Sequence, residues 1–593
     1  MIETITPSMV VQELPVRDPE FRIDPETQGT LIVPSALEVY RVNDRAEVSW
    51  TASEAPLVSE QAERILREIV AASEREAHRH PRSARARVNY GVALLNAGLL
   101  GNAADQFEMA CTFDPKNLSA LAHLARVRLL DERPADALDL ANQVKDLDPT
   151  NALGALLIAS AAMAEGDINT ATESLNDARR LSPNNWVPEY LLSLILISQR
   201  EGRTAIRHLR SAARHQPRSA AIQHALGVAF GLEGEWHKAS RAFREALSLA
   251  PRRRDSALAL AHVMLRRGAM DDAISVLSDW DVALPHDREV QELLASAYSF
   301  LKNYRAAKRH LLIALHSIPS TQEHAMDRGR LLNNIGVCSA YLEDYEDAIS
   351  WYSKSLQTDR TSVAFRNLAK AYREIDNLDG ARKVLAVAIA ENPGDSDAKL
   401  LSGVVAAESG RADDAIVTLT ALIQGGDAVA AAYGSLGWVL SDEKRDYSAA
   451  LVTLSEGYAR FGDDSVIANN LAYVNLMLGN VDAAREVLAK VSESEGLGSI
   501  YLTATRGLLH LWEGDFNGAE RLYRAAESLA RQQGSSGLAK SVRQKMHLEF
   551  ARAFLRIGDT RSAHEHVKDG LLIKGRRSYV ADLKGLNVRL LRA

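Results

Sequence analysis

The sequence predicts an all-α fold in which one helix pair is repeated along most of the chain. Alanine and leucine are abundant, and small and aromatic residues recur at fixed offsets. A row of prolines in which each follows the last by 34 residues sets the period: Pro81, Pro115, Pro149, Pro183, Pro217, Pro251, Pro285 and Pro319. Such a period is typical of a solenoid, in which stacked neighbours bury one continuous core.

One repeat shows what each position does. Gly227 lies where two helices approach closely, because it has no side chain to hold them apart. Ala239, Phe243 and Ala246 share one face of the second helix, so the ring of Phe243 fills the space between them. Pro251 ends that helix, because its ring fixes φ and it lacks an N–H.

These positions resemble the tetratricopeptide repeat, a helix–turn–helix unit of about 34 residues with small, aromatic and proline residues at the same offsets. About fourteen copies cover residues 84–575. The resemblance implies a right-handed superhelical solenoid, with the first helix of each pair lining a concave groove. It also implies a protein-interaction module.

The expected division of the chain follows the repeats. It comprises an extended N-terminal arm at 1–57, a capping helix at 58–80, a first array at 84–321, a second array at 329–493, C-terminal repeat pairs at 499–575 and a capping helix at 578–593.

Two parts of this division leave alternatives open. The arm contains two short strand-like runs, so it is either an ordered, hairpin-like segment packed on the array or a tether that folds on binding. The break in the period at 320–328 is either a longer loop or extra helical turns.

No constellation of residues predicts catalysis. Phosphate-binding glycine motifs are missing, and only about 57 residues lie outside the repeats. The close histidine pairs His78 and His80, and His564 and His566, are two residues apart and do not share a helix face, which argues against a metal clamp. We therefore expect no enzyme, no metal and no cofactor.

Charge and targeting signals narrow the class of partner. A net charge of −7 is not that of a general nucleic-acid binder. The N-terminal residues have neither a basic segment nor an apolar core, which argues against a secretory signal. No apolar run approaches the length of a membrane-spanning helix. Cys111 and Cys338 do not indicate a disulfide framework. The expectation is a cytoplasmic protein without membrane contact, for which nucleic acid is a disfavoured partner.

The resemblance places the partner site on the concave side of the first helices. An asparagine two positions before the Gly/Ala landmark often bonds a peptide backbone in this family, and its amide both donates and accepts. Here that position holds Asn89, Asn334, Asn367 and Asn470. The other interpretation is that these amides cap neighbouring helices or meet water.

The ninth repeat is the strongest single candidate. Arg366, Lys370 and Arg373 flank Asn367, and Asn333 and Asn334 precede them by one repeat. This cationic, amide-lined patch suits an acidic or carboxylate-bearing peptide. A chaperone tail is not favoured, because the clamp known in this family needs lysine and asparagine where Val337, Asp397 and Leu401 stand.

Three further surfaces are candidates. Leu156 and Tyr190 belong to an apolar face of the third and fourth repeats, and Trp438 and Tyr473 to an aromatic groove farther on. A convex stripe in the fourth repeat is either a solvated face or a docking patch for an acidic protein or an RNA backbone. It consists of Arg200, Arg203, Arg207, Arg210 and Arg214.

The function that these features predict is a non-catalytic scaffold or adaptor that holds protein partners in its groove and assembles a complex. A regulatory subunit of an enzyme encoded elsewhere is the leading alternative, and an RNA-binding helical repeat is a third. Solenoid ends often self-associate, so a homo-oligomer is also among the expected assemblies.

Overall fold

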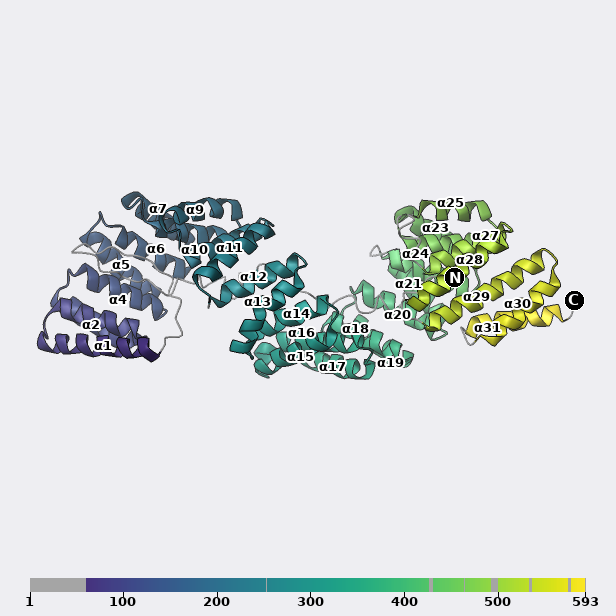
Figure 1. Cartoon of the computed structure of the whole chain (residues 1–593), viewed down its shortest axis with the longest axis horizontal. Coiled ribbons are helices and arrows are strands. Elements are labelled where there is room, and N and C mark those ends of the chain that lie inside the picture. The colour runs from purple at the N-terminus through teal and green to yellow at the C-terminus, as the bar shows by residue number, and fades with distance from the viewer. Residues whose placement is uncertain are drawn as a thin grey trace. The chain divides into compact units, whose positions relative to one another are not determined.

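The computed structural model describes residues 60–251, 253–425, 430–462, 464–491, 500–532, 536–573 and 577–591. In those ranges every regular element is a helix, and successive helices pack on one another within each of two compact units (Figure 1). The expected all-α repeat fold is thereby confirmed. The predicted arm at 1–57, with its strand-like runs, lies outside the described residues.

The chain divides into two compact units, one ending at Ser317 and the other beginning at Ile318. The helices of the first unit are α1 (Glu60–Arg79), α2 (Ala84–Asn96), α3 (Leu100–Phe113), α4 (Leu118–Leu130), α5 (Pro134–Leu147), α6 (Ala152–Glu165), α7 (Ile168–Leu181), α8 (Trp186–Ser198), α9 (Gly202–His215), α10 (Ala220–Leu232), α11 (Trp236–Leu249), α12 (Arg254–Arg266), α13 (Met270–Ala283), α14 (Arg288–Phe300) and α15 (Tyr304–Ser317).

The second unit continues the same alternation of first and second helices. Its elements are η3 (Gln322–His324), α16 (Ala325–Tyr341), α17 (Tyr345–Thr358), α18 (Ser362–Glu374), α19 (Leu378–Glu391), α20 (Ser396–Glu408), α21 (Ala412–Gln424), α22 (Ala430–Trp438), η4 (Val439–Glu443), α23 (Tyr447–Arg460), α24 (Ser465–Leu478), α25 (Val481–Lys490), α27 (Ile500–Trp512), α28 (Phe516–Gln532), α29 (Ser536–Arg556), α30 (Thr560–Leu572) and α31 (Arg577–Leu590).

The prolines that set the period also set where second helices stop. The residue before each of several prolines leaves the helical region: Asp114 has φ −143° and ψ 89°, and Asp148 has φ −142° and ψ 83°. The ring of a following proline clashes with a helical residue before it, so this position is driven to extended backbone. The next first helix then begins at a side-chain cap such as Asn117, whose Oδ1 accepts from Ala120 N–H at 3.0 Å.

A left-handed residue closes the turn inside the helix pairs. In the first unit these residues are Gly98, Glu132, Gly166, Arg200, Gly234, Gly268 and Lys302, each 34 after the last. Glycine takes this conformation without a Cβ penalty. The non-glycine members show that the position is set by the turn and is kept where glycine is absent.

The core inside each pair depends on matched volumes. A Cβ on Gly227 would lie 2.5 Å from the ring of Phe243, and one on Gly336 would lie 2.6 Å from Tyr352. Another pair of the first unit holds Ala159 and Leu175 at the same 16-residue spacing, both fully buried. Glycine thus faces an aromatic ring in some pairs, and alanine accompanies leucine in others.

Two departures from the regular repeat affect the second unit. The break predicted near 320–328 contains a short turn, η3, and α16 is 17 residues long against 13 for α14, so the insertion adds both a turn and helical residues. At the end of α22 the chain forms the π-helical segment η4 and reaches the left-handed Arg445, with φ 56°. None of the helices in the described ranges has the length and apolarity that a bilayer crossing requires.

Candidate partner-binding site

One cluster in the first unit has the residue types of a hydrolase triad and cannot act as one. His224 Nδ1 lies 2.9 Å from Ser256 Oγ, and its Nε2 lies 3.7 Å from Asp255. Ser256 is fully buried, so its hydroxyl cannot reach a substrate. Burial lowers the pKa of His224 to about 4. The cluster therefore stabilises the contact between α10 and α12.

The second unit contains a histidine pair that sequence spacing does not predict. His566 does not pair with His564; its Nδ1 lies 3.1 Å from Nδ1 of His547 on α29. Burial and His566 lower the pKa of His547 to about 4, so one neutral ring donates to the other. Among the described residues, no group of three or more His, Cys, Asp or Glu side chains is arranged to hold a metal.

Buried histidines are expected to make the fold acid-sensitive. His123 is 2% exposed, and burial, assisted by Arg126, lowers its pKa to about 3. Because this pKa is below the unfolded value of 6.5, stability present above pH 6.5 is lost as the pH falls toward 3. At pH 5 the loss from this residue is about 2 kcal/mol.

Urea unfolding at pH 7.5 and pH 5.0 measures this loss. The variant His123→Phe, which keeps an aromatic ring stacked on Phe107, should lose less stability between the two pH values than the wild type. Replacement of the exposed His78 by glutamine is the control for the loss of one histidine. An unchanged pH dependence in His123→Phe would show that His123 does not carry the effect.

The candidate site lies on the first helices α16, α18 and α20 of the second unit. An amide chain joins the first two: Asn367 Nδ2 donates to Asn333 Oδ1 at 3.0 Å, and Asn333 Nδ2 donates to Asn334 Oδ1 at 3.3 Å. Asn333 and Asn334 are 4% and 6% exposed, whereas Asn367 is half-buried. Part of the predicted amide lining thus links one repeat to the next.

The basic residues of the ninth repeat reach acidic residues of the following one. Arg366 lies 2.8 Å from Asp395 and 3.7 Å from Asp397, and Arg373 lies 2.8 Å from Glu408. All three carboxylates belong to α20 or to the residue that caps it. The patch is therefore a row of alternating charge, and the prediction that it is cationic is wrong.

The remaining site residues predicted from the sequence are mostly buried. Leu156 and Trp438 are 1% exposed and Tyr473 is 2% exposed, while Tyr190 is buried at 7%. Asn470 is fully buried, and its Nδ2 donates to the carbonyl of Gly434 at 3.2 Å. A contact between a partner and these side chains stays a prediction, and it requires the groove to open at those places.

The arginine stripe predicted on the convex side of the fourth repeat is exposed to solvent. Arg203, Arg207, Arg210 and Arg214 are all exposed on α9, and Arg200 lies in the turn before it. Arg203 is held by Glu233 at 2.8 Å, whereas Arg207 and Arg214 contact only hydroxyl groups of their own helix among the contacts found in the described residues. Docking of a partner here stays a prediction.

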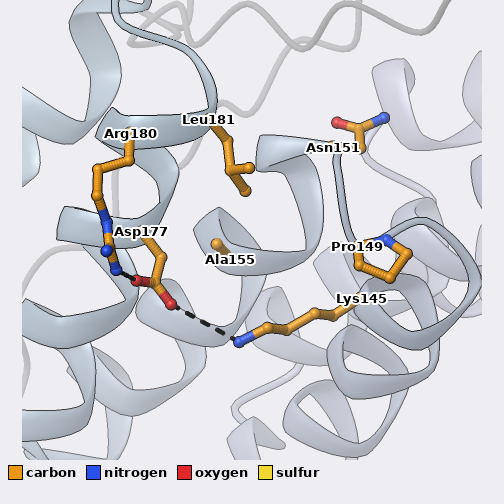
Figure 2. A pocket seen from close by; sticks show the side chains of 7 residues that line it. All are labelled: Lys145, Pro149, Asn151, Ala155, Asp177, Arg180 and Leu181. Carbon is orange, nitrogen blue, oxygen red and sulfur yellow. Dashed lines mark hydrogen bonds and ion pairs between the residues drawn. The ribbon is translucent and has the colours of Figure 1, made fainter.

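A surface pocket lies between α5, α6 and α7. Figure 2 shows Asp177 between Arg180 and Lys145, to which it is ion-paired, with Pro149, Asn151, Ala155 and Leu181 completing the lining. Asn151 caps α6 by accepting from Leu153 N–H at 3.0 Å. Because its polar side chains bond one another or the backbone, this pocket carries no functional assignment.

Comparison with known families agrees with this geometry. Family models described as tetratricopeptide repeat match residues 59–117, 232–311 and 341–403. These stretches are tetratricopeptide repeats. Such repeats generally form non-catalytic protein-interaction modules, which supports a general role in protein interaction for this chain. No curated protein matches it.

Several solved structures are similar to this chain, all at low sequence identity. A tetratricopeptide repeat protein from Parabacteroides merdae has 17% identity over 42% of this chain and 97% of its own, with a TM-score of 0.34. The APC/C hetero-tetramer Cut9–Hcn1 has 14% identity over 79% and 96%, also at 0.34. YrrB, titled a TPR protein with an unusual peptide-binding site, has 16% identity over 32% and 96%, at 0.25.

Proposed function

We propose that this protein is a non-catalytic adaptor that holds an extended, carboxylate-bearing segment of a partner on the face formed by α16, α18 and α20, and thereby assembles a multiprotein complex. The observation that carries the proposal is the row of amide and charged side chains along successive first helices. An amide can pair with a backbone of any sequence, and charged groups fix its register.

Three half-buried side chains of α18 are the contact residues of the proposal. Asn367 offers its amide, and Lys370 and Arg366 offer cations on the same face. A partner carboxylate would compete with Asp397 for Arg366, since that contact is 3.7 Å long and Asp397 is itself 66% exposed. The face favours a segment that brings its own negative charge.

The place of action that fits this role is the cytoplasm. Neither Cys111 nor Cys338 forms a disulfide in the structure. A chain of this size with two cysteines and no disulfide between them suits a reducing compartment.

Affinity capture from the native cell extract tests the adaptor proposal. The variant Lys370→Glu, which reverses one charge on the α18 face, should recover at least ten-fold less of the partner that the wild type recovers. The control is Lys383→Glu, which makes the same charge change at an exposed position of α19 in the same repeat. Equal recovery by Lys370→Glu and the control would reject the α18 face as the site.

A further inference from the structure

The C-terminal part of the second unit contains a buried polar row on α29. Lys545, Glu549 and Arg552 follow one another at spacings of four and three, so they share one helix face. Lys545 and Glu549 are only 3% and 2% exposed. Burying charges is costly unless each is paired and hydrogen-bonded, so the partners of this row decide whether it is stable.

Part of the pairing is internal to α29. Lys545 Nζ lies 2.9 Å from Glu549 Oε1, and an Arg552 Nη lies 2.8 Å from the same carboxylate. Lys545 also donates to Tyr473 Oη of α24 at 3.0 Å. One carboxylate of α29 therefore faces two cations of α29, and a further negative charge has to come from elsewhere.

That charge comes from α31. Asp582 accepts from Arg552 at 2.9 Å and is also ion-paired with Arg445, which lies in the turn after η4. The ring of Tyr579 lies beneath the Lys545 ammonium, 5.1 Å from ring centre to nitrogen. The α31 seat, defined by Arg445, Lys545 and Arg552 together with Tyr473, thus receives one carboxylate and one aromatic ring.

A single turn of α31 makes nearly all of these contacts. Tyr579 is 5% exposed and Leu583 is fully buried, in a cluster with Leu548 and Val567. Beyond that turn Leu586 and Leu590 pack, partly buried, on the same cluster, whereas Val588 and Leu591 are 48% and 71% exposed. A helix of this length is marginal in water by itself, so α31 depends on its seat for stability.

We propose that the α31 seat is a second binding site, which takes a partner helix that carries an aromatic residue, a carboxylate three positions later and an apolar residue next to it. In the present structure α31 occupies the seat with Tyr579, Asp582 and Leu583. Two convergent arginines suit a carboxylate because guanidinium groups bond it directionally, and a lysine above an aromatic ring adds a cation–π contact.

Exchange between α31 and a partner helix is a competition. The tethered α31 is present at an effective concentration of the order of millimolar, so a free segment of equal affinity binds weakly until α31 is loosened. The proposal concerns a different place from the α18 face, and either site can exist without the other.

The test uses the full chain and a labelled peptide with the sequence of residues 577–591. The variant Tyr579→Ala/Asp582→Asn removes the two anchors of α31 and leaves the seat intact. Fluorescence anisotropy should show that the peptide binds this variant at least ten-fold more tightly than it binds the wild type. The control Glu565→Gln, at an exposed carboxylate of α30, should behave like the wild type.

A second peptide and a second measurement make the result decisive. The peptide carrying the same Tyr→Ala and Asp→Asn changes should bind the variant at least ten-fold more weakly than the unmodified peptide. In the wild type, a millimolar concentration of the unmodified peptide should speed hydrogen exchange of the α31 amides and leave the α20 amides unchanged. Equal binding of the two peptides, or no change in α31 exchange, would overturn the proposal and leave the α18 site untouched.

Discussion

Replacing Glu549 with alanine is expected to lower the free energy of unfolding of the second unit by about 3–5 kcal/mol. The change removes the carboxylate that lies between Lys545 and Arg552 and leaves one buried and one half-buried cation without their nearest counter-charge. Burial alone would raise the pKa of Glu549, yet Arg552 and Lys545 hold it at about 2. The carboxylate is therefore charged in the folded state under all ordinary conditions.

Urea unfolding followed by circular dichroism at pH 7.5 measures the effect. The exposed Glu565→Ala change on α30 is the matched control and should stay within about 0.5 kcal/mol of the wild type. Because the folded pKa of about 2 lies below the unfolded 4.5, the contribution of Glu549 should be present above pH 4.5 and fade as the pH falls toward 2. If the free energy of unfolding falls by less than about 1 kcal/mol at pH 7.5, water solvates Lys545 and Arg552 when Glu549 is absent.

Replacing Phe243 with alanine is expected to cost about 3–5 kcal/mol in the first unit. The ring is fully buried and lies against Gly227, where no side chain is present to fill the space that it would leave. The single change Gly227→Ala should also destabilise, by about 1–3 kcal/mol, since its Cβ would lie 2.5 Å from the ring.

The double variant Gly227→Ala/Phe243→Leu gives the matched comparison. It creates the combination that Ala159 and Leu175 already form in another repeat of the same unit. It should therefore be more stable than either Phe243→Ala or Gly227→Ala alone, as seen in the midpoint of thermal unfolding. Additive losses in the double variant would show that the two positions do not fit each other as a pair.

The fold could be predicted because its signals are local and repeated. Pro251 and its equivalents stop second helices through their own ring geometry, and Gly227 and Phe243 report a contact within one helix pair. The same repeated signals predict α18 as a first helix with Arg366, Asn367 and Lys370 on one side.

The electrostatics of the site could not be predicted in the same way. Arg366 is paired with Asp395 and Arg373 with Glu408 across adjacent repeats, and the pattern within one repeat indicates only the basic partners. Tyr473 was expected to line an open groove, but Lys545, 72 residues later, covers its hydroxyl. That contact depends on how tightly successive helix pairs curve, which no single repeat encodes.

The ion pair between Arg445 and Asp582 has a consequence for how the C-terminal part comes apart. In an ideal repeat protein each repeat contacts only the repeats beside it, so the array can unfold gradually from its ends. Arg445 and Asp582 are 137 residues apart, with several helix pairs between them. The Arg445–Asp582 ion pair and the hydrogen bond from Lys545 to Tyr473 both connect helices that are far apart in the sequence. The helix pairs between these residues are therefore coupled, and we expect them to unfold together.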